Sequence, residues 1–167
     1  MKRIQLILLL ICLVGSETVW ATKPKAPIES YIQPTIFSLT MVMLHDVVNP
    51  PAASRFYTYA LVSAQSILSA ENNEVLNPKE YIKGFPTLKF TKPVDANIKL
   101  SALYSILETG RLMLPSGFQL ETDQQKLLEK WKKEGYADKE IAASVEYAKS
   151  ISPQIVAWSK TDGYLKL

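Results

Sequence analysis

Two successive prolines, Pro50 and Pro51, follow Asn49 between two long apolar segments of the chain. Proline disfavours helical geometry in the residue before it and donates no backbone hydrogen bond, so the first segment cannot continue past this point as a helix. The same prolines suit the first turn of a second helix, and the Asn49 side chain can cap that helix. The chain is therefore expected to fold as two apolar helices joined by a short, stiff turn.

The segment before this turn, Ile36 to Val48, is apolar around most of its helical circumference. Such a helix needs burial on all sides, and Pro34 suits its first turn. Residues 22–33 carry two prolines and several polar side chains, which predicts a linker. Ordered structure is thus expected from Pro34 onward, as a helical domain over residues 34–167.

Three more helical segments follow an irregular stretch, residues 71–93, in which one short helix fits. Asp95 is expected to cap the third main helix, which ends before the turn Pro115-Ser116-Gly117. Thr122 and Gln125 have the spacing of a capping box for the fourth helix, and a fifth helix completes the chain. Because no segment alternates with a period of two, the sequence predicts an all-α bundle of about five main helices with one long irregular loop.

The N-terminus has the pattern of a secretory signal peptide spanning residues 1–21. A basic start precedes the apolar core Ile4 to Val14, and Val19-Trp20-Ala21 offers a cleavage site, so the protein is expected to be exported, either periplasmic or secreted. The core is shorter than the ~20 residues that cross a bilayer, so membrane contact is expected only through an uncleaved signal segment. Cys12 follows bulky residues, which argues against its lipidation.

Charge and rare residues exclude several classes of function. The net charge of +3, from 19 basic and 16 acidic residues, is too small to predict a nucleic-acid-binding surface. One cysteine and one histidine cannot build a zinc ribbon, a paired-thiol redox site or a mechanism with two imidazoles.

The most conspicuous polar pair is His45-Asp46, within an apolar helix and next to the double proline. We expect His45 to be buried and hydrogen-bonded in a structural role, with general-base catalysis as the alternative. Arg55 can pair with Asp46 across the turn, or it can bind an anion at the start of the next helix. Trp131 and Trp158 have aliphatic neighbours at helical spacing and are expected in the core.

Two stretches of sequence are similar to a known family. The stretch Met43 to Tyr57 (MLHDVVNPPAASRFY) resembles the N-terminal helical region of bacterial vanadium-dependent haloperoxidase-like proteins, of the phosphatidic acid phosphatase type 2 superfamily, and Trp158 to Tyr164 (WSKTDGY) resembles a second landmark of these proteins. The landmark residues, which we expect to have structural roles, are His45, Asp46, Asn49, Pro50, Pro51, Arg55, Trp158, Asp162 and Gly163.

The resemblance implies a helical-bundle enzyme that holds vanadate or phosphate with lysine, arginine, serine, glycine and histidine. Vanadate-bearing members oxidise halides with peroxide, and relatives hydrolyse phosphate esters. This chain departs from the family's catalytic pattern, because it contains no Arg-Pro and because Pro115-Ser116-Gly117-Phe118 lacks the histidine of the family's Pro-Ser-Gly-His. We therefore assign no catalytic, cofactor or metal residue to this chain, and vanadate is expected only in the complete enzyme.

Three functions remain open from the sequence. The first is a scaffold that corresponds to the N-terminal half of such an enzyme, truncated or split from its catalytic half and inactive alone; its partner would be the missing C-terminal catalytic domain or a second copy. This reading predicts an uncovered apolar face on the Ile36 to Val48 helix. The second is an independent exported binding module with a closed surface. The third is a small enzyme in which His45, Asp46 and Arg55 converge in a pocket.

Overall fold

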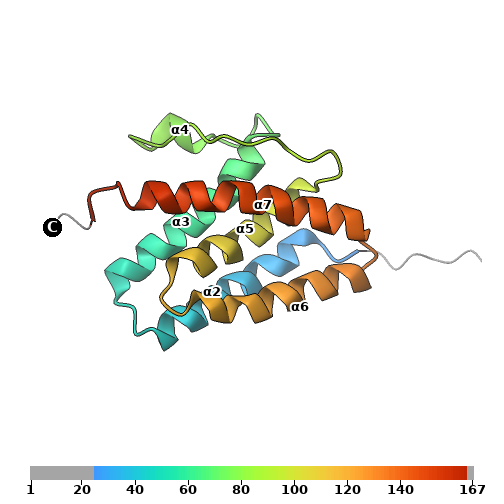
Figure 1. Ribbon diagram of the computed structural model, residues 1–167, viewed down its shortest axis with the longest axis horizontal. Helices are drawn as coiled ribbons and strands as arrows, with labels where there is room; N and C mark the ends of the chain where they lie inside the picture. Colours follow the sequence, from blue (N-terminus) through green and yellow to red (C-terminus); the bar gives the residue numbers. More distant parts are fainter. Residues whose placement is uncertain (1–24, 165–167) are drawn as a thin grey trace, which may run out of the picture.

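The computed structural model describes residues 25–164, so the predicted signal peptide and Cys12 lie outside the described residues. These residues contain helices and no strand, which confirms the all-α prediction (Figure 1). No helix between residues 25 and 164 is long and apolar enough to cross a membrane. The elements are η1 (Ile28–Tyr31), α2 (Ile32–His45), α3 (Pro50–Ser69), α4 (Pro78–Tyr81), α5 (Ile98–Met113), η2 (Gly117–Gln119), α6 (Leu120–Lys133) and α7 (Asp138–Ser159).

Helical structure begins earlier than the prolines predicted. The 3-10 helix η1 and the first residues of α2 lie within the segment that we expected to be a linker. Tyr31 explains the difference, because its side chain is 2% exposed and its ring meets the ring of Trp131 edge-on at 6.5 Å. Aromatic burial thus makes the segment that precedes Pro34 part of the bundle.

The helix caps follow the sequence at one site and depart from it at two. Asn49 caps α3 as predicted, since its Oδ1 accepts a hydrogen bond from the backbone N–H of Ala52 at 3.0 Å. The cap of α5 is Asn97 rather than Asp95, and Asp95 instead pairs with a lysine of α7. The predicted capping box at Thr122 does not form, because η2 runs directly into α6 and its carbonyls accept the first N–H groups of that helix.

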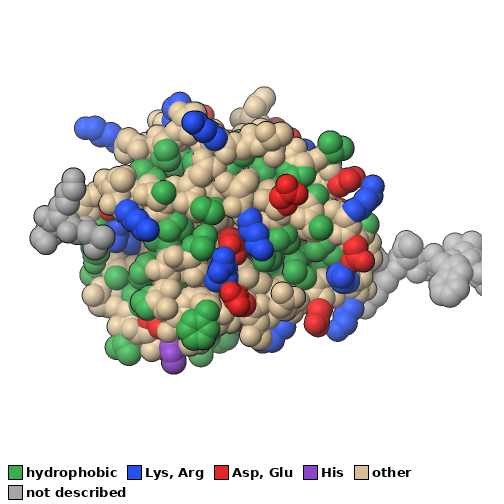
Figure 2. All heavy atoms as spheres, in the orientation of Figure 1, with side chains coloured by type: hydrophobic (Ala, Val, Ile, Leu, Met, Phe, Trp, Pro, Cys, Tyr) green, Lys and Arg blue, Asp and Glu red, His purple; other side chains and the backbone are tan. Residues whose placement is uncertain are grey.

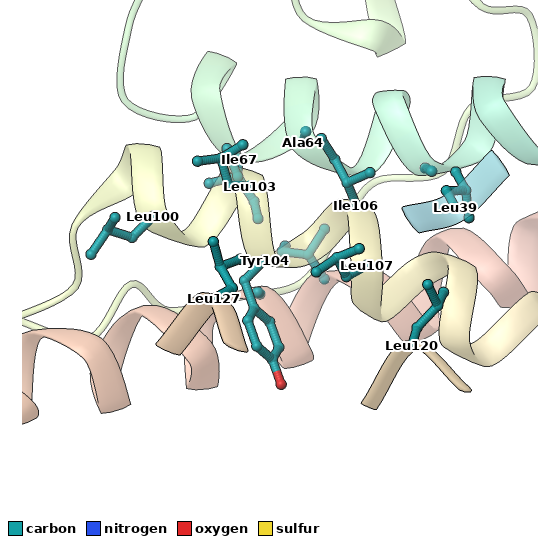
Figure 3. Packing of buried hydrophobic residues seen from close by; sticks show 14 of the residues in the cluster. Leu39, Ala64, Ile67, Leu100, Leu103, Tyr104, Ile106, Leu107, Leu120 and Leu127 are labelled. Carbon is teal, nitrogen blue, oxygen red and sulfur yellow. The ribbon is translucent and has the colours of Figure 1, made fainter. Parts of the chain in front are cut away.

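Helix α5 occupies the centre of the bundle. Eleven consecutive residues, Leu100 to Gly110, are buried, and the helix contacts α3, α7, α2 and α6. Figure 3 shows its leucines and isoleucine between side chains of α3 on one side and those of α6 on the other. Close approach of α2 depends on Gly110, because a Cβ at this position would overlap the Leu39 side chain.

Helix α2 lies at the edge of the bundle and buries only one side. The buried side chains are Thr35, Leu39, Val42 and Met43. On the other side, large apolar residues are exposed, as the sequence predicted for an uncovered face: Ile32 47%, Phe37 57%, Met41 48% and Leu44 66%. The helix ends in a left-handed turn at Val47, whose φ of 52° is strained for a β-branched residue.

The irregular segment between α3 and α5 crosses the bundle at the top of Figure 1 and carries the short helix α4. Gln154 of α7 holds it through both ends of one amide: Oε1 accepts from the N–H of Lys89 at 2.8 Å, and Nε2 donates to the Lys89 carbonyl at 2.6 Å. The ring of Phe90 also packs 5.6 Å from that of Tyr147. These contacts fix the segment as one wall of the cavity described below.

Candidate functional site

A cavity lies where three parts of the chain meet: the start of α3, the end of α7 and the irregular segment. It encloses about 820 Å³ and opens to solvent. Aromatic and apolar side chains form much of its wall, and cationic, anionic and hydroxyl groups border it. The lining residues are Ser54, Arg55, Thr58, Tyr59, Val62, Tyr81, Ile82, Lys83, Gly84, Trp158, Thr161 and Asp162.

A charged cluster at the cavity joins the two landmark stretches, although they are far apart in sequence. Arg55 forms an ion pair with Asp162, 107 residues further along the chain, and the two side chains are 25% and 19% exposed. Tyr59 lies one turn after Arg55 on α3, accepts a hydrogen bond from its Nη2 at 3.2 Å, and donates its own hydroxyl hydrogen to Asp162. The Arg55 guanidinium also stacks 3.6 Å from the centre of the Tyr164 ring.

This cluster holds its charges firmly. Burial favours the neutral acid of Asp162, but hydrogen bonds from Tyr59 and Arg55 outweigh it and lower the pKa of the carboxyl group. Burial likewise opposes the charge of Arg55, yet hydrogen bonds to Asp162 and Tyr59 raise its pKa. Burial and the hydrogen bond to Asp162 raise the pKa of Tyr59. The ion pair therefore stays intact near neutral pH, and the cluster positions groups rather than exchanging protons.

Trp158 connects the cluster to the cavity wall. Its ring lies edge-on to those of Tyr59 at 5.4 Å and Phe85 at 4.9 Å. The side chain is only half-buried and lines the cavity, so its predicted place in the core is corrected to the edge of the core. The corresponding prediction for Trp131 is confirmed, because that side chain is 0% exposed.

The prediction for His45 is wrong. The residue ends α2 with its side chain exposed, because the last turn of α2 presents it outward, and Figure 2 shows the single histidine at the lower edge of the molecule. Asp46 does not pair with Arg55 either, since its Oδ2 accepts a hydrogen bond from the backbone N–H of Ser116 at 3.0 Å. Asp46 thus ties the end of α2 to the turn after α5. The three residues do not converge in one pocket, and this contradicts the small-enzyme hypothesis.

The turn Pro115-Ser116-Gly117-Phe118 ends α5, as predicted. A Cβ at Gly117 would overlap the backbone of Arg111, so glycine allows the chain to turn closely over the end of α5. Arg111 itself binds Glu108 with two hydrogen bonds of 2.9 and 2.7 Å. The carboxylate of Glu108 is 3% exposed and also accepts from Gln124 at 2.8 Å.

These positions do not fit vanadate or phosphate. A tetrahedral oxyanion needs several converging cationic donors to hold it, and an imidazole if histidine is to act as its ligand or nucleophile. Within residues 25–164 both arginines are paired with carboxylates in separate clusters, and the histidine lies at neither. No group of three or more histidine, cysteine, aspartate or glutamate side chains suited to a metal occurs in that range.

Sequence reasoning missed several residues of the site. Tyr59 carries a detectable signal, because a residue four positions after Arg55 shares its helix face. Tyr164 lies within the second landmark stretch but was assigned no role. Tyr81 and Lys83 come from the irregular segment, whose path over α3 and α7 no local pattern predicts.

Comparison with known proteins finds a similarity among solved structures. No family profile and no curated protein matches the sequence. Among solved structures, a bacterial vanadium-dependent iodoperoxidase superposes with a TM-score of 0.69 at 24% sequence identity. The match covers 82% of this chain and 33% of that chain, so this chain spans about a third of the length of the structure it resembles. At this identity the likeness shows a haloperoxidase-like helical fold and nothing more specific.

Proposed function

We propose that the chain is an exported helical scaffold that corresponds to the N-terminal region of a vanadium haloperoxidase or acid phosphatase-like protein. In this proposal it lacks the oxyanion-binding half and is inactive alone. Membership of the phosphatidic acid phosphatase type 2 superfamily, and vanadate as the cofactor of the complete enzyme, belong to the same proposal.

One observation carries the proposal: most of this chain superposes on only a third of the iodoperoxidase. The uncovered apolar side of α2 supports it, since Phe37 and Leu44 are 57% and 66% exposed on a helix without a charged residue. Apolar surface of this kind usually marks a contact with another protein part. A catalytic half that packs against α2 would remove this surface from water.

The two arginines support inactivity of the chain alone. Arg55 and Arg111 already hold Asp162 and Glu108, so an oxyanion would have to displace a carboxylate from either arginine. Displacement from Glu108 would leave a buried charge without its partner, which is strongly unfavourable.

The test is an activity and binding measurement on the protein purified from an exporting host. We expect no iodide or bromide oxidation with peroxide and vanadate, no hydrolysis of a phosphomonoester, and no heat on titration with vanadate or phosphate. Mass spectrometry of the same sample should find an N-terminus at Thr22. Turnover by the purified chain would contradict the scaffold proposal, and an intact Met1 would contradict export.

The cavity favours a second candidate, an exported binding module. Its wall combines aromatic rings with the exposed ammonium group of Lys83, a combination suited to a small aromatic anion. Trp158 would report such a ligand by fluorescence, with Trp131→Phe to remove the signal of the buried indole. Saturable quenching by an aromatic carboxylate that Lys83→Ala weakens, with Lys79→Ala as the matched control, would favour the binding module over the scaffold.

A further inference from the structure

The serine and threonine hydroxyls that line the cavity at the end of α7 already donate their hydrogens to the backbone. Ser54 donates to the carbonyl of Pro51 and Thr58 to the carbonyl of Ser54, each at 2.8 Å. Thr161 donates to the carbonyl of Trp158, also at 2.8 Å. Because a hydroxyl group has one hydrogen, each of these oxygens has only lone pairs left for a ligand.

The two tyrosine hydroxyls of the same wall are committed in the same way. Gln65 donates from Nε2 to the Leu76 carbonyl at 2.8 Å, so its Oε1 is free to accept, and the Tyr81 hydroxyl donates to that oxygen at 2.7 Å. Tyr59 donates its hydrogen to Asp162. The hydroxyl groups of the cavity therefore face a ligand as hydrogen-bond acceptors.

The other side chains of the wall indicate the rest of the ligand. Arg55 and Asp162 neutralise each other, which leaves Lys83 to bind an anionic group. The half-buried ring of Trp158 offers an apolar surface to a flat ring. We infer that the cavity binds an aromatic carboxylate that carries ring hydroxyls, with the carboxylate at Lys83 and the ring hydroxyls donating to the serine and threonine oxygens. This inference rests on the binding module proposed above and names its class of ligand.

A ligand whose ring carries no hydrogen-bond donor would fit this wall less well. Binding removes water from the wall, and a protein oxygen that accepted from water is then left without a donor. An ether oxygen on the ligand would bring two acceptors together, unless the protein hydroxyl gave up its bond to a backbone carbonyl. Size does not make this selection, because the cavity of about 820 Å³ lies within the roughly 300–1,000 Å³ of small-molecule sites.

The experiment compares two aromatic acids by titration calorimetry on the purified whole protein. Protocatechuate carries two ring hydroxyls, and veratrate carries methoxy groups at the same positions, so both acids keep the carboxylate and the ring. We expect protocatechuate to bind at least about fivefold more tightly, the effect of one hydrogen bond of ordinary strength.

Replacement of the acceptors tests where the ring hydroxyls bind. Ser54→Ala, Thr58→Val and Thr161→Val, combined in one variant, should lower the preference for protocatechuate by at least about threefold. Thr91→Val with Thr122→Val is the matched control, because both threonines are exposed and neither lines the cavity. This control should leave the preference unchanged.

The outcomes separate the inference from the proposal on which it rests. Equal dissociation constants for the two acids, or a preference that the combined variant keeps in full, would overturn the inference and leave the binding module standing. If neither acid bound, the binding module would be wrong and the inference with it. No outcome affects the scaffold proposal, which depends on activity and processing.

Discussion

Helix α5 is more deeply buried than helix α2, although α5 contains more polar residues. Helix α5 contains serines, a threonine, a glycine and Glu108, yet its residues from Leu100 to Gly110 are all buried. Helix α2 contains no charged residue, yet four of its large apolar side chains are about half exposed. Position in the bundle, rather than polarity, decides which helix is covered.

The difference shows how each helix meets its requirements. Several polar groups on α5 have hydrogen-bond partners: Ser105 donates to the carbonyl of Ala102 at 2.8 Å, and Glu108 binds Arg111 and Gln124, whereas the buried hydroxyl of Thr109 has no partner. Ser105 and Glu108 can be buried at little cost because their side chains have hydrogen-bond partners. Exposed apolar side chains on α2 have no comparable local remedy, and they remain in contact with water.

A truncation on each helix tests the comparison most strongly. Leu107→Ala on α5 removes a side chain that is 2% exposed and should lower the free energy of unfolding by roughly 2–5 kcal/mol. Phe37→Ala on α2 removes a side chain that is 57% exposed and should change it by less than about 0.5 kcal/mol. Urea denaturation measures both values. Equal losses would mean that α2 is already covered in the monomer.

The buried carboxylate of α5 gives the next largest effect. Glu108→Ala leaves Arg111 and Gln124 without their acceptor and should cost about 2–3 kcal/mol of unfolding free energy. Glu121→Ala is a matched control, since Glu121 also approaches Arg111, at 3.6 Å, but is 62% exposed. That control should cost less than about 0.5 kcal/mol. Equal losses of unfolding free energy in the two variants would show that burial of Glu108 does not strengthen the contribution of its hydrogen bonds.

The same carboxylate predicts a pH dependence. Burial opposes its charge, but hydrogen bonds from Arg111 and Gln124 prevail, so the pKa of Glu108 lies below its ordinary value of 4.5. Its contribution to stability is therefore full above pH 4.5 and is lost as the pH falls from there through the pKa of the folded state. The midpoint temperature of thermal unfolding should fall less steeply from neutral to acidic pH in Glu108→Ala than in the unaltered protein. If the unfolding temperature fell equally with pH in both proteins, Glu108 would not contribute to the loss of stability in acid.

The smallest expected effect concerns the end of α2. Val47 has a φ of 52° and is 87% exposed, so its strain is not offset by burial. Asparagine tolerates this conformation better, and Val47→Asn should raise the free energy of unfolding by about 0.5–1 kcal/mol. Val48→Asn is a suitable control because Val48 packs against the core, and it should destabilise. A loss of stability in Val47→Asn would mean that Val47 makes contacts that outweigh its strain.

The sequence predicts the fold well because the signals for helices are local. Asn49 and the two prolines mark the boundary between α2 and α3, and periodic apolar residues place the main helices. The cap of α5 was misassigned because aspartate and asparagine both cap helices well. Choosing between Asp95 and Asn97 requires knowing that the helix begins at Ile98, which the sequence does not specify. The early start of α2 depends on burial of Tyr31 against Trp131, a contact 100 residues away that no local pattern contains.

The candidate site was predictable only in part. The two landmark stretches contain Arg55, Trp158 and Asp162, all of which line the cavity. Their pairing was missed because Asp46 is near Arg55 in sequence, whereas Asp162 is near it in space. His45 was expected to be buried because its helix is apolar. Since α2 is buried on only one side, whether a residue is buried depends on its angular position around the helix axis, and His45 lies on the exposed side.

The clamp between Gln154 and Lys89 gives the irregular segment a property that is unusual for a loop. The glutamine amide presents a donor and an acceptor to one peptide group, much as a neighbouring β-strand would. The Lys89 amide hydrogen should consequently exchange with deuterated water more slowly than the amides of the segment that have no hydrogen-bond partner. Exchange of this amide, measured by NMR on the unaltered protein, therefore reports whether the irregular segment is bound to α7.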